Sequence, residues 1–230
     1  MKASLPRLLT GLVVLPAVLV LLAARLSGAS ASTLAAPLPN PEFDAGLATA
    51  AGEEIAYFAG GCFWGVEGVF EHVKGVKSAV SGYSGGDPAA ANYDAVSGGN
   101  SGHAEAVKVV FDPKQISYGQ LLKIFFTVAH DPTQLNRQGP DRGTQYRSAI
   151  FYDNAAQQQI AKKYIDQLTA AKSFPKPIVT QLVKLDVFHE AEKYHQDYMV
   201  HHPNQPYIMI HDAPKVAALK KQFAAVYRER

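Results

Sequence analysis

The amino-acid sequence predicts an α+β domain, a ferredoxin-like two-layer sandwich with the element order βαββαβ. Two observations support this fold class. Short apolar or alternating runs of strand length are interleaved with longer runs of helical periodicity, in the order strand, helix, strand, strand, helix, strand. Clusters of Gly, Pro and Asp separate these runs and mark the turns. Additional helices and an irregular C-terminal tail are expected outside the core.

The first half of the predicted core contains three strands and one helix. The strands are expected at 54–59, 76–83 and 104–111, and the helix is expected from Phe63 to about Val73. Gly60 and Gly61 end the first strand because glycine tolerates the sharp change of direction. A loop is expected from Tyr93 to Gly102, and Asp112-Pro113 stops the third strand.

The second half of the core is expected to begin with a helix that Ser117 caps and that runs through Val128. A long polar loop at 130–145 then leads to a strand at 147–152. The later elements are expected to be a helix from Asn154 to about Ala171, a strand at 178–185, a helix at 187–200, and a last helix from Val216 within the tail that begins at Pro203.

Length and charge narrow the possible functions. The chain has 230 residues, enough for one sizeable domain, and its formal net charge is +2. Its basic residues are scattered along the sequence and do not form the concentrated positive surface that nucleic-acid binding requires. The composition indicates a globular protein with no nucleic-acid partner.

The N-terminus has the pattern of a bacterial secretory signal. Lys2 and Arg7 precede an apolar stretch at 8–24, and small residues follow, with Ala29-Ser30-Ala31 as the expected cleavage site. The apolar stretch is slightly long for a cleaved signal, so a retained anchor in the inner membrane is the alternative. The expected organisation is a signal peptide or membrane anchor at 1–31, a linker at 32–52 and a catalytic domain at 53–230, in a periplasmic or secreted protein.

Cys62 is the only cysteine of the chain. A lone thiol cannot form an internal disulfide, and it is too few for an all-cysteine zinc site. It is therefore either an inert core residue or a reactive nucleophile. Its position at a strand-to-helix turn favours the nucleophile, since the backbone amides and dipole at a helix N-terminus stabilise a thiolate. Phe63 and Trp64 beside it would then wall an apolar pocket instead of joining the core.

Gly-Cys-Phe-Trp-Gly at 61–65 resembles the active-site signature of the A-type peptide methionine sulfoxide reductases. The resemblance continues through 101–107, 130–148 and 188–196, although the family usually has Asn where Pro140 stands. It implies a catalytic acid at Glu105 and two tyrosines, Tyr93 and Tyr146, whose hydroxyls hold the sulfoxide oxygen. It also implies four substrate-binding residues, which are Phe63, Trp64, Asp141 and His195.

From the residues alone these assignments have ordinary alternatives. Glu105 could be a surface glutamate on an alternating strand, Asp141 an aspartate that caps a turn, and Tyr146 a tyrosine packed at a strand start. The resemblance, in contrast, implies reduction of methionine S-sulfoxide, free or in oxidised proteins, as repair after oxidative stress. The Cys62 thiolate would attack the sulfoxide sulfur, Glu105 would supply a proton, and Cys62 would become a sulfenic acid.

The resemblance implies no bound cofactor or metal and an external thiol reductant such as thioredoxin, glutaredoxin with glutathione, or dithiothreitol. Many relatives carry resolving cysteines near the C-terminus, whereas this chain has none, and Tyr207 stands near a usual resolving position. We therefore expect a one-cysteine member of the family, in which the partner proteins are a thiol reductant and oxidised substrates.

Three other readings remain open on the sequence. One is a cysteine hydrolase or acyltransferase, in which His103, His130 or His195 would serve as the base for Cys62. The second is a secreted binding module without catalytic activity, whose cysteine is a core residue. The third is a metal site on one helix face, formed by the His-x-x-Glu-x-x-His spacing of residues 189–195.

Overall fold

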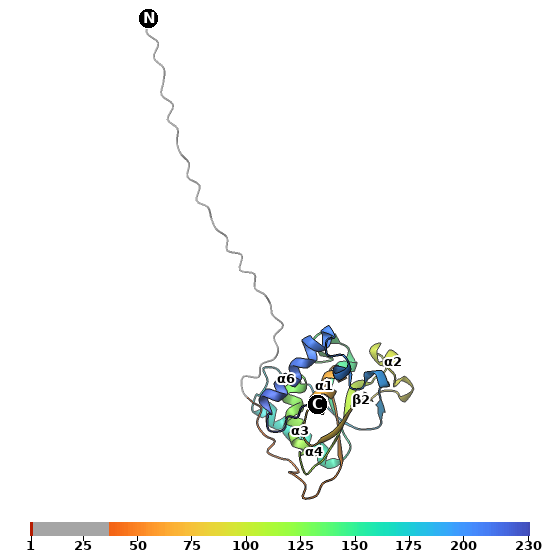
Figure 1. Cartoon of the computed structure of the whole chain (residues 1–230), viewed down its shortest axis with the longest axis vertical. Coiled ribbons are helices and arrows are strands. Elements are labelled where there is room, and N and C mark those ends of the chain that lie inside the picture. The colour runs from red at the N-terminus through yellow and green to blue at the C-terminus, as the bar shows by residue number, and fades with distance from the viewer. Residues whose placement is uncertain (2–36) are drawn as a thin grey trace. The chain divides into compact units, whose positions relative to one another are not determined.

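The computed structural model describes Met1 and residues 37–230 (Figure 1). The predicted signal or anchor segment therefore lies outside the described residues, except for Met1. Within the described part of the chain, no helix is long and apolar enough to cross a membrane.

The domain is built on a six-stranded sheet with the order β7-β6-β1-β3-β2-β8. The strands are β1 (Glu54–Gly60), β2 (Val76–Ser84), β3 (Ala104–Phe111), β6 (Ser148–Tyr152), β7 (Gln181–Lys184) and β8 (Phe188–Glu190). The four central strands, β6, β1, β3 and β2, pair antiparallel in the order of a ferredoxin-like core. β7 adds to one edge parallel to β6, and β8 adds to the other edge antiparallel to β2. The predicted fold class is confirmed.

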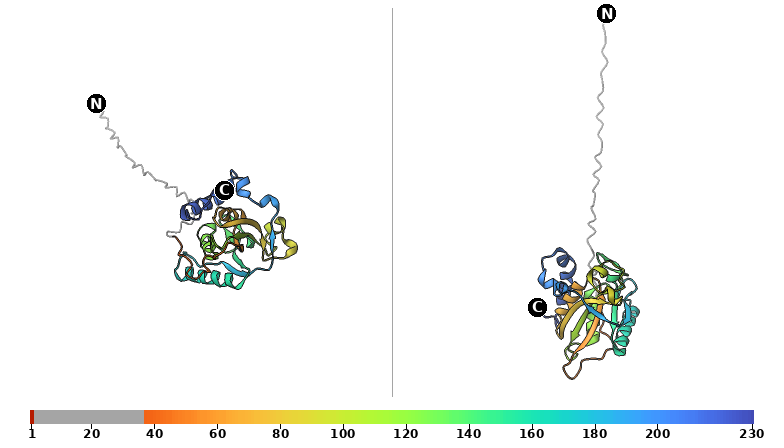
Figure 2. Two further views of the ribbon diagram at one scale, coloured as in Figure 1. Left: turned by 60° about the horizontal axis from the view of Figure 1, so that its bottom comes forward. Right: turned by 90° about the vertical axis from the view of Figure 1, so that its right-hand side faces the viewer.

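Helices pack against this sheet, and their N-termini are specified locally. The helices are α1 (Phe63–Glu71), α2 (Tyr93–Ser97), α3 (Tyr118–Ile124), α4 (Ala155–Ala170), α5 (Tyr198–His201) and α6 (Ala213–Gln222). Ser117 forms a capping box with Gln120 at the start of α3, and the Asn154 side chain caps α4. A π-helical turn, η2 (Phe125–Ala129), continues α3. Figure 2 shows α4 and α6 toward opposite ends of the domain, and buried residues of both helices join the same hydrophobic core as α1 and α3.

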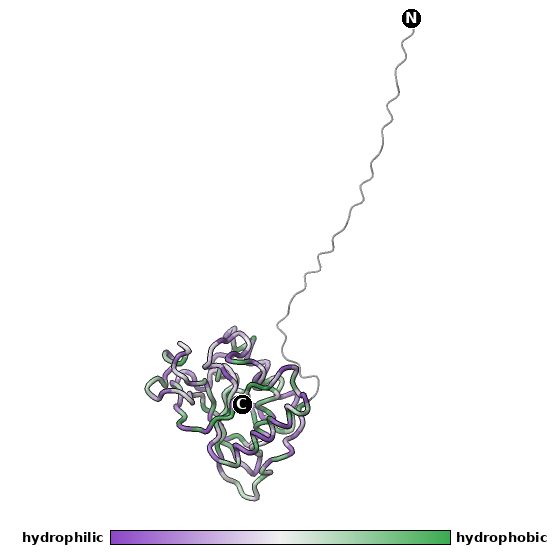
Figure 3. The backbone as a smooth tube through the Cα atoms, turned by 180° about the vertical axis from the view of Figure 1, so that it is seen from behind, coloured by the Kyte–Doolittle hydropathy of each residue, from purple (hydrophilic) through white to green (hydrophobic). Residues whose placement is uncertain are grey.

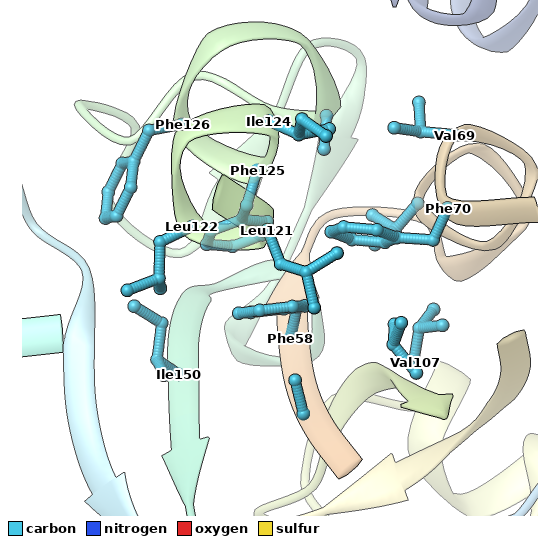
Figure 4. Packing of buried hydrophobic residues seen from close by; sticks show 14 of the residues in the cluster. Phe58, Val69, Phe70, Val107, Leu121, Leu122, Ile124, Phe125, Phe126 and Ile150 are labelled. Carbon is cyan, nitrogen blue, oxygen red and sulfur yellow. The ribbon is translucent and has the colours of Figure 1, made fainter. Parts of the chain in front are cut away.

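The main core lies between the sheet and α1 and α3. Figure 4 shows Phe58 of β1 among side chains of both helices, including Phe70 and Leu121. The Phe58 ring stacks on that of Phe70, with centroids 5.1 Å apart, and on that of Phe125, with centroids 4.9 Å apart. Apolar stretches of the backbone run through the interior of the domain, as the hydropathy colouring in Figure 3 shows. This burial fixes the ends of β1 and α1, between which Cys62 lies.

One predicted helix is absent. The segment 187–200, expected to be helical, instead contains strand β8, the short 3-10 turn η4 (Lys193–His195) and the start of α5. The open edge of β2 offers hydrogen bonds that a helix would forgo, because Gly82–Ser84 pairs with β8. The Gln196 side chain then satisfies both backbone groups of Ser81 at 2.9 Å. Tertiary hydrogen bonding therefore overrides the local helical pattern.

The predicted long loop and the tail also contain structure. Within the loop, β4 (Arg137–Gln138) and β5 (Asp141–Arg142) form a small hairpin, and the 3-10 turn η3 (Thr144–Tyr146) follows. In the tail, the π-helical η5 (Ile208–Asp212) leads into α6. The expected loop after β2 contains α2, which Tyr93 begins.

The described part of the predicted linker, 37–52, has no helix or strand but lies against the domain. Leu38 is buried in the main core, and the Pro39 carbonyl accepts a hydrogen bond of 2.9 Å from the Tyr164 hydroxyl. The Asp44 carboxylate accepts the Gly119 backbone N–H at 3.0 Å. This stretch is therefore held against α3 and α4 by specific contacts.

Candidate active site

Cys62 is the N-cap residue of α1, directly after the turn that ends β1. Gly61 has a φ of +93°, which disfavours any side chain, and a Cβ there would clash with the side chain of Gln138. Cys62 as a whole is 7% exposed. The predicted strand-to-helix turn is confirmed, and the thiol lies beneath the surface.

Glu105 lies beside Cys62 because of the alternation of β3. Its side chain projects to the same face of the sheet as Val107 and Val109, the face that α1 covers. One Glu105 oxygen accepts a hydrogen bond of 3.0 Å from the backbone N–H of Phe63, the residue after the cysteine. Glu105 is only 3 % exposed, and this burial raises its pKa to about 8, although the bond from Phe63 opposes the rise. The carboxyl group is therefore largely protonated at neutral pH.

The thiol is also held in its neutral form. Burial raises the pKa of Cys62 well above its ordinary value, and the carboxyl groups of Glu105 and Asp212 raise it further. A hydrogen bond from the Trp64 backbone and the charge of Lys215 act in the opposite direction but do not prevail. Desolvation of the thiol is thus a larger effect than the stabilisation of a thiolate expected from the helix N-terminus.

Two tyrosines face this carboxyl–thiol pair. Tyr93 is the first residue of α2, and Tyr146 is the last residue of η3. Burial raises the pKa of both phenols, and the neighbouring Glu105 and Cys62 raise them further. Both hydroxyls are consequently neutral and able to donate hydrogen bonds.

An aromatic cluster forms the other side of the site. Phe63 is 1 % exposed, and its ring lies 5.8 Å from that of Tyr83 and 5.1 Å from that of His195, between centroids. Trp64 is only partly buried, and its Nε1–H donates to Nδ1 of His195 at 3.2 Å. Trp64 therefore offers the accessible apolar surface next to the thiol, while Phe63 supports it from the core.

His195 and Asp141 approach the site from the later part of the chain. His195 lies in η4, and burial lowers its pKa, so the ring is neutral. Since Nδ1 accepts from Trp64, the proton is on Nε2, which is buried without a hydrogen-bond partner among the described residues. Asp141 lies on β5 and accepts a hydrogen bond from the Tyr207 hydroxyl. All eight residues predicted for the site thus fall on elements around the start of α1.

The other candidate bases are engaged elsewhere. His130 bonds to the Phe125 carbonyl at 3.1 Å and to Ser148 Oγ at 2.7 Å, and its pKa is lowered by burial to about 4. His103 bonds to the Asp87 carbonyl at 2.9 Å and accepts from the Gly86 N–H at 3.2 Å. His195, in turn, accepts from Trp64. The geometry therefore removes the Cys–His hydrolase from consideration.

The metal site considered on one helix face is also excluded, because residues 189–195 do not form a single helix. Residue 189 lies on β8, Glu192 precedes η4, and His195 lies within η4. Glu192 instead accepts the Tyr83 hydroxyl and the Tyr93 backbone N–H, each at 2.8 Å.

Comparison with known proteins shows which family the chain belongs to. A family profile described as peptide methionine sulfoxide reductase matches residues 54–227. The chain belongs to the peptide methionine sulfoxide reductase family. The enzymes of this family reduce methionine sulfoxide through a catalytic cysteine, and Cys62 is the only cysteine available to this member.

Individual relatives agree with the assignment. The reductase named MsrA 2 of Mesorhizobium japonicum is 58% identical over 181 residues, which are 79% of this chain and 93% of the relative. The reductase named MsrA 2 of Synechocystis sp. is 52% identical over 189 residues, covering 81% of this chain and 88% of the relative. Both are of the A type that the sequence signature indicated.

Solved structures of the reductase family share the fold. Methionine sulfoxide reductase A of Corynebacterium diphtheriae matches with a TM-score of 0.58 and 33% identity, over 74% of this chain and 87% of that chain. The reduced form of Mxr1 from Saccharomyces cerevisiae matches with a TM-score of 0.62 and 30% identity, over 69% of this chain and 90% of that chain.

The structure adds reductase residues that the sequence reading did not assign. Glu192 joins Tyr83 to Tyr93, as described above, and Tyr198 stacks on Trp64. Asp212 and Lys215 approach Cys62 from the C-terminal part of the chain. Of these residues, only Glu192 lies in a stretch, 188–196, that resembles the family. Local sequence patterns do not reveal the others, because their contacts join segments far apart in the sequence.

Proposed function

We propose that this reductase acts on the S epimer of methionine sulfoxide, with Cys62 as nucleophile and Glu105 as proton donor. The hydrogen bond between Glu105 and the Phe63 N–H is the observation that supports these roles. It holds a carboxylic acid, with a pKa raised to about 8, next to the residue that follows the thiol. A protonated carboxyl group and a sulfur nucleophile on one side of a buried site suit transfer of oxygen from sulfur to sulfur.

The substrate is expected to enter with its methyl group against Trp64, over the buried ring of Phe63. Its sulfoxide oxygen would then face the Glu105 carboxyl and the hydroxyls of Tyr93 and Tyr146, which are neutral donors. The Nε2–H of His195, which has no hydrogen-bond partner among the described residues, and the carboxylate of Asp141 would bind the peptide backbone of the substrate.

The proposed chemistry is balanced without a cofactor. The Cys62 sulfur bonds to the sulfoxide sulfur as Glu105 protonates the oxygen, and the thiol proton replaces the one that Glu105 gave. The oxygen, now carrying a proton, passes to the Cys62 sulfur as its bond to the substrate sulfur breaks. The sulfur–sulfur bond breaks as methionine leaves, and Cys62 remains as a sulfenic acid. The substrate sulfur gains two electrons, and the Cys62 sulfur loses two.

Recycling requires thiols from outside the chain, because Cys62 has no second cysteine to pair with. A first thiol would condense with the sulfenic acid, releasing water and leaving a mixed disulfide on Cys62. A second thiol would then release the reduced enzyme. Thioredoxin, glutaredoxin with glutathione, and dithiothreitol all provide this chemistry.

We also propose that the enzyme is exported and repairs oxidised proteins outside the cytoplasm. The charged, apolar and small-residue regions of residues 1–31 support this proposal. A fusion of residues 1–45 to a reporter that is active only outside the cytoplasm should show activity. A mature N-terminus near Ser32 would indicate a cleaved signal, while Met1 in the membrane fraction would indicate an anchor. A full-length cytosolic product would contradict export.

The decisive test of the reaction is dithiothreitol-driven reduction of separated S and R sulfoxides. Turnover of the S epimer and not of the R epimer is expected, and Cys62→Ser should abolish it because the hydroxyl is a far weaker nucleophile. Retained turnover by Cys62→Ser, or preference for the R epimer, would overturn the proposal. Circular dichroism of the variant provides the control for folding.

A further inference from the structure

A buried ion pair lies beside the active-site helix. Asp212, the last residue of η5, is fully buried, and its Oδ1 lies 3.0 Å from Nζ of Lys215 in the first turn of α6. The Lys215 side chain is 18% exposed. The other carboxylate oxygen of Asp212 is buried and has no hydrogen-bond partner among the described residues. Such a group is costly to bury, so its retention calls for a role.

The pair packs directly against the first turn of α1. A Cβ at Gly65 would overlap both the Asp212 carboxylate and the Lys215 ammonium, so the absence of a side chain there lets the ion pair approach the helix backbone. Gly65 follows Cys62 by one helical turn. From this position the carboxylate raises the pKa of the thiol and the ammonium lowers it.

The charged and titratable groups around the thiol come from several elements. β3 contributes Glu105, the loop hairpin contributes Asp141, and the segment from η5 to α6 contributes Asp212 and Lys215. The phenols that face it are those of Tyr93, Tyr146 and Tyr207. Lys215 is the cation in this set and lowers the pKa of the thiol, whereas the carboxyl groups of Glu105 and Asp212 raise it.

We propose that the Asp212–Lys215 pair sets the nucleophilicity of Cys62, with Lys215 stabilising the developing thiolate and Asp212 holding the ammonium against α1. The negative charge of the Asp212 carboxylate disfavours the thiolate, so the two members of the pair act on Cys62 in opposite directions. The pair is a positioning device for the known reaction, and this inference rests on the proposed role of Cys62 as the nucleophile.

The test is the pH dependence of Cys62 alkylation by iodoacetamide in the full chain without substrate. Lys215→Met should raise the pH midpoint and slow alkylation at pH 7.5 by about tenfold, which corresponds to about one unit in the pKa of the thiol. Lys215→Arg should retain the wild-type midpoint. Asp212→Asn, which keeps an oxygen for Lys215, should lower the midpoint and speed alkylation.

Lys220→Met is the matched control, because it removes a lysine from the same helix whose partner is the exposed Glu229. It should leave the midpoint unchanged. An unchanged midpoint in Lys215→Met, or shifts in the same direction in Lys215→Met and Asp212→Asn, would overturn the inference. A lower melting temperature in Lys215→Met with wild-type alkylation would show a purely structural ion pair.

Failure of this inference is distinct from failure of the proposed function. If the Cys62→Ser variant still reduced the sulfoxide, Cys62 would not be the nucleophile, and both proposals would fail. An inactive Cys62→Ser together with an unchanged alkylation midpoint in Lys215→Met would leave the proposed function intact and reject the role of the ion pair.

Discussion

Tyr198 stacks face to face on Trp64, with ring centroids 3.7 Å apart and planes 6° from parallel. The ring of Tyr207 lies nearly perpendicular to the same indole, with ring centroids 6.1 Å apart. The Nε1–H of the indole donates a hydrogen bond to His195. One face of Trp64 is thus covered by the C-terminal part of the chain. Tyr198, Tyr207 and His195 thus hold the orientation of the indole, and in the proposed mode of binding the substrate methyl group would contact its remaining surface.

Replacing Tyr198 should therefore weaken substrate binding by loosening Trp64. For Tyr198→Ala we expect a higher KM and a loss of about 0.5–1.5 kcal/mol in kcat/KM, the usual worth of an aromatic pair. Tyr198→Phe keeps the stack and should behave as wild type. Steady-state kinetics with a sulfoxide peptide measure both variants, and an unchanged KM in Tyr198→Ala would show that Trp64 keeps its position unaided.

Glu105→Gln should slow the reductase step, because the amide cannot protonate the departing oxygen. We expect a decrease of roughly 10²–10⁴-fold in the single-turnover rate at pH 7, the usual range for general acid catalysis. Substrate affinity should change much less, since the amide still accepts the Phe63 N–H. Rapid-quench detection of methionine measures the step, and a wild-type rate would show that another group donates the proton.

The same variant should change how stability depends on pH. Because the folded-state pKa of Glu105 is raised from 4.5 to about 8, the unfolded chain releases this proton more readily, and the wild type loses stability as the pH rises between these values. Glu105→Gln lacks this loss, so its unfolding free energy relative to wild type should increase with pH, by at most about 1.4 kcal/mol per pH unit. Urea unfolding at pH 5 and pH 8 tests this, and a pH-independent difference would mean that Glu105 ionises freely.

Glu192 should matter through Tyr93. Its carboxylate accepts both the Tyr83 hydroxyl and the Tyr93 N–H, and hydrogen bonds to charged groups are worth about 1.5–3 kcal/mol each. Glu192→Ala should lower kcat/KM by about tenfold, and Glu192→Gln should restore much of it. Glu190→Ala, which breaks only the exposed pair with Lys108, is the control. Equal effects of Glu190→Ala and Glu192→Ala on kcat/KM would contradict a specific role.

Turnover without reductant should stop after one event. We expect one equivalent of methionine per enzyme and one added oxygen on Cys62 by mass spectrometry, because the chain has no resolving cysteine. A small dithiol should restart turnover. Rapid formation of a turnover-competent, disulfide-linked dimer would show instead that two chains resolve each other.

Local signals in the sequence were sufficient for the central elements. The glycines before Cys62 end β1, Ser117 begins α3 and Asn154 begins α4, each through contacts within a few residues. The prediction failed at 187–200, where helical spacing competed with an open strand edge and with hydrogen bonds to Ser81. These partners lie more than 100 residues earlier in the chain, so no local pattern contains them.

Patterns in the sequence predicted the core order and the position of Cys62 before a helix, and the resemblance indicated the family. The protonation state of the site, in contrast, follows from tertiary packing. This packing buries Cys62 and Glu105 together, so desolvation keeps both protonated where the helix N-terminus alone would favour a thiolate. It also brings Glu192, Tyr198 and the Asp212–Lys215 pair to the start of α1. Burial and electrostatic interaction depend on distance in space, and a sequence specifies that distance only once the chain has folded.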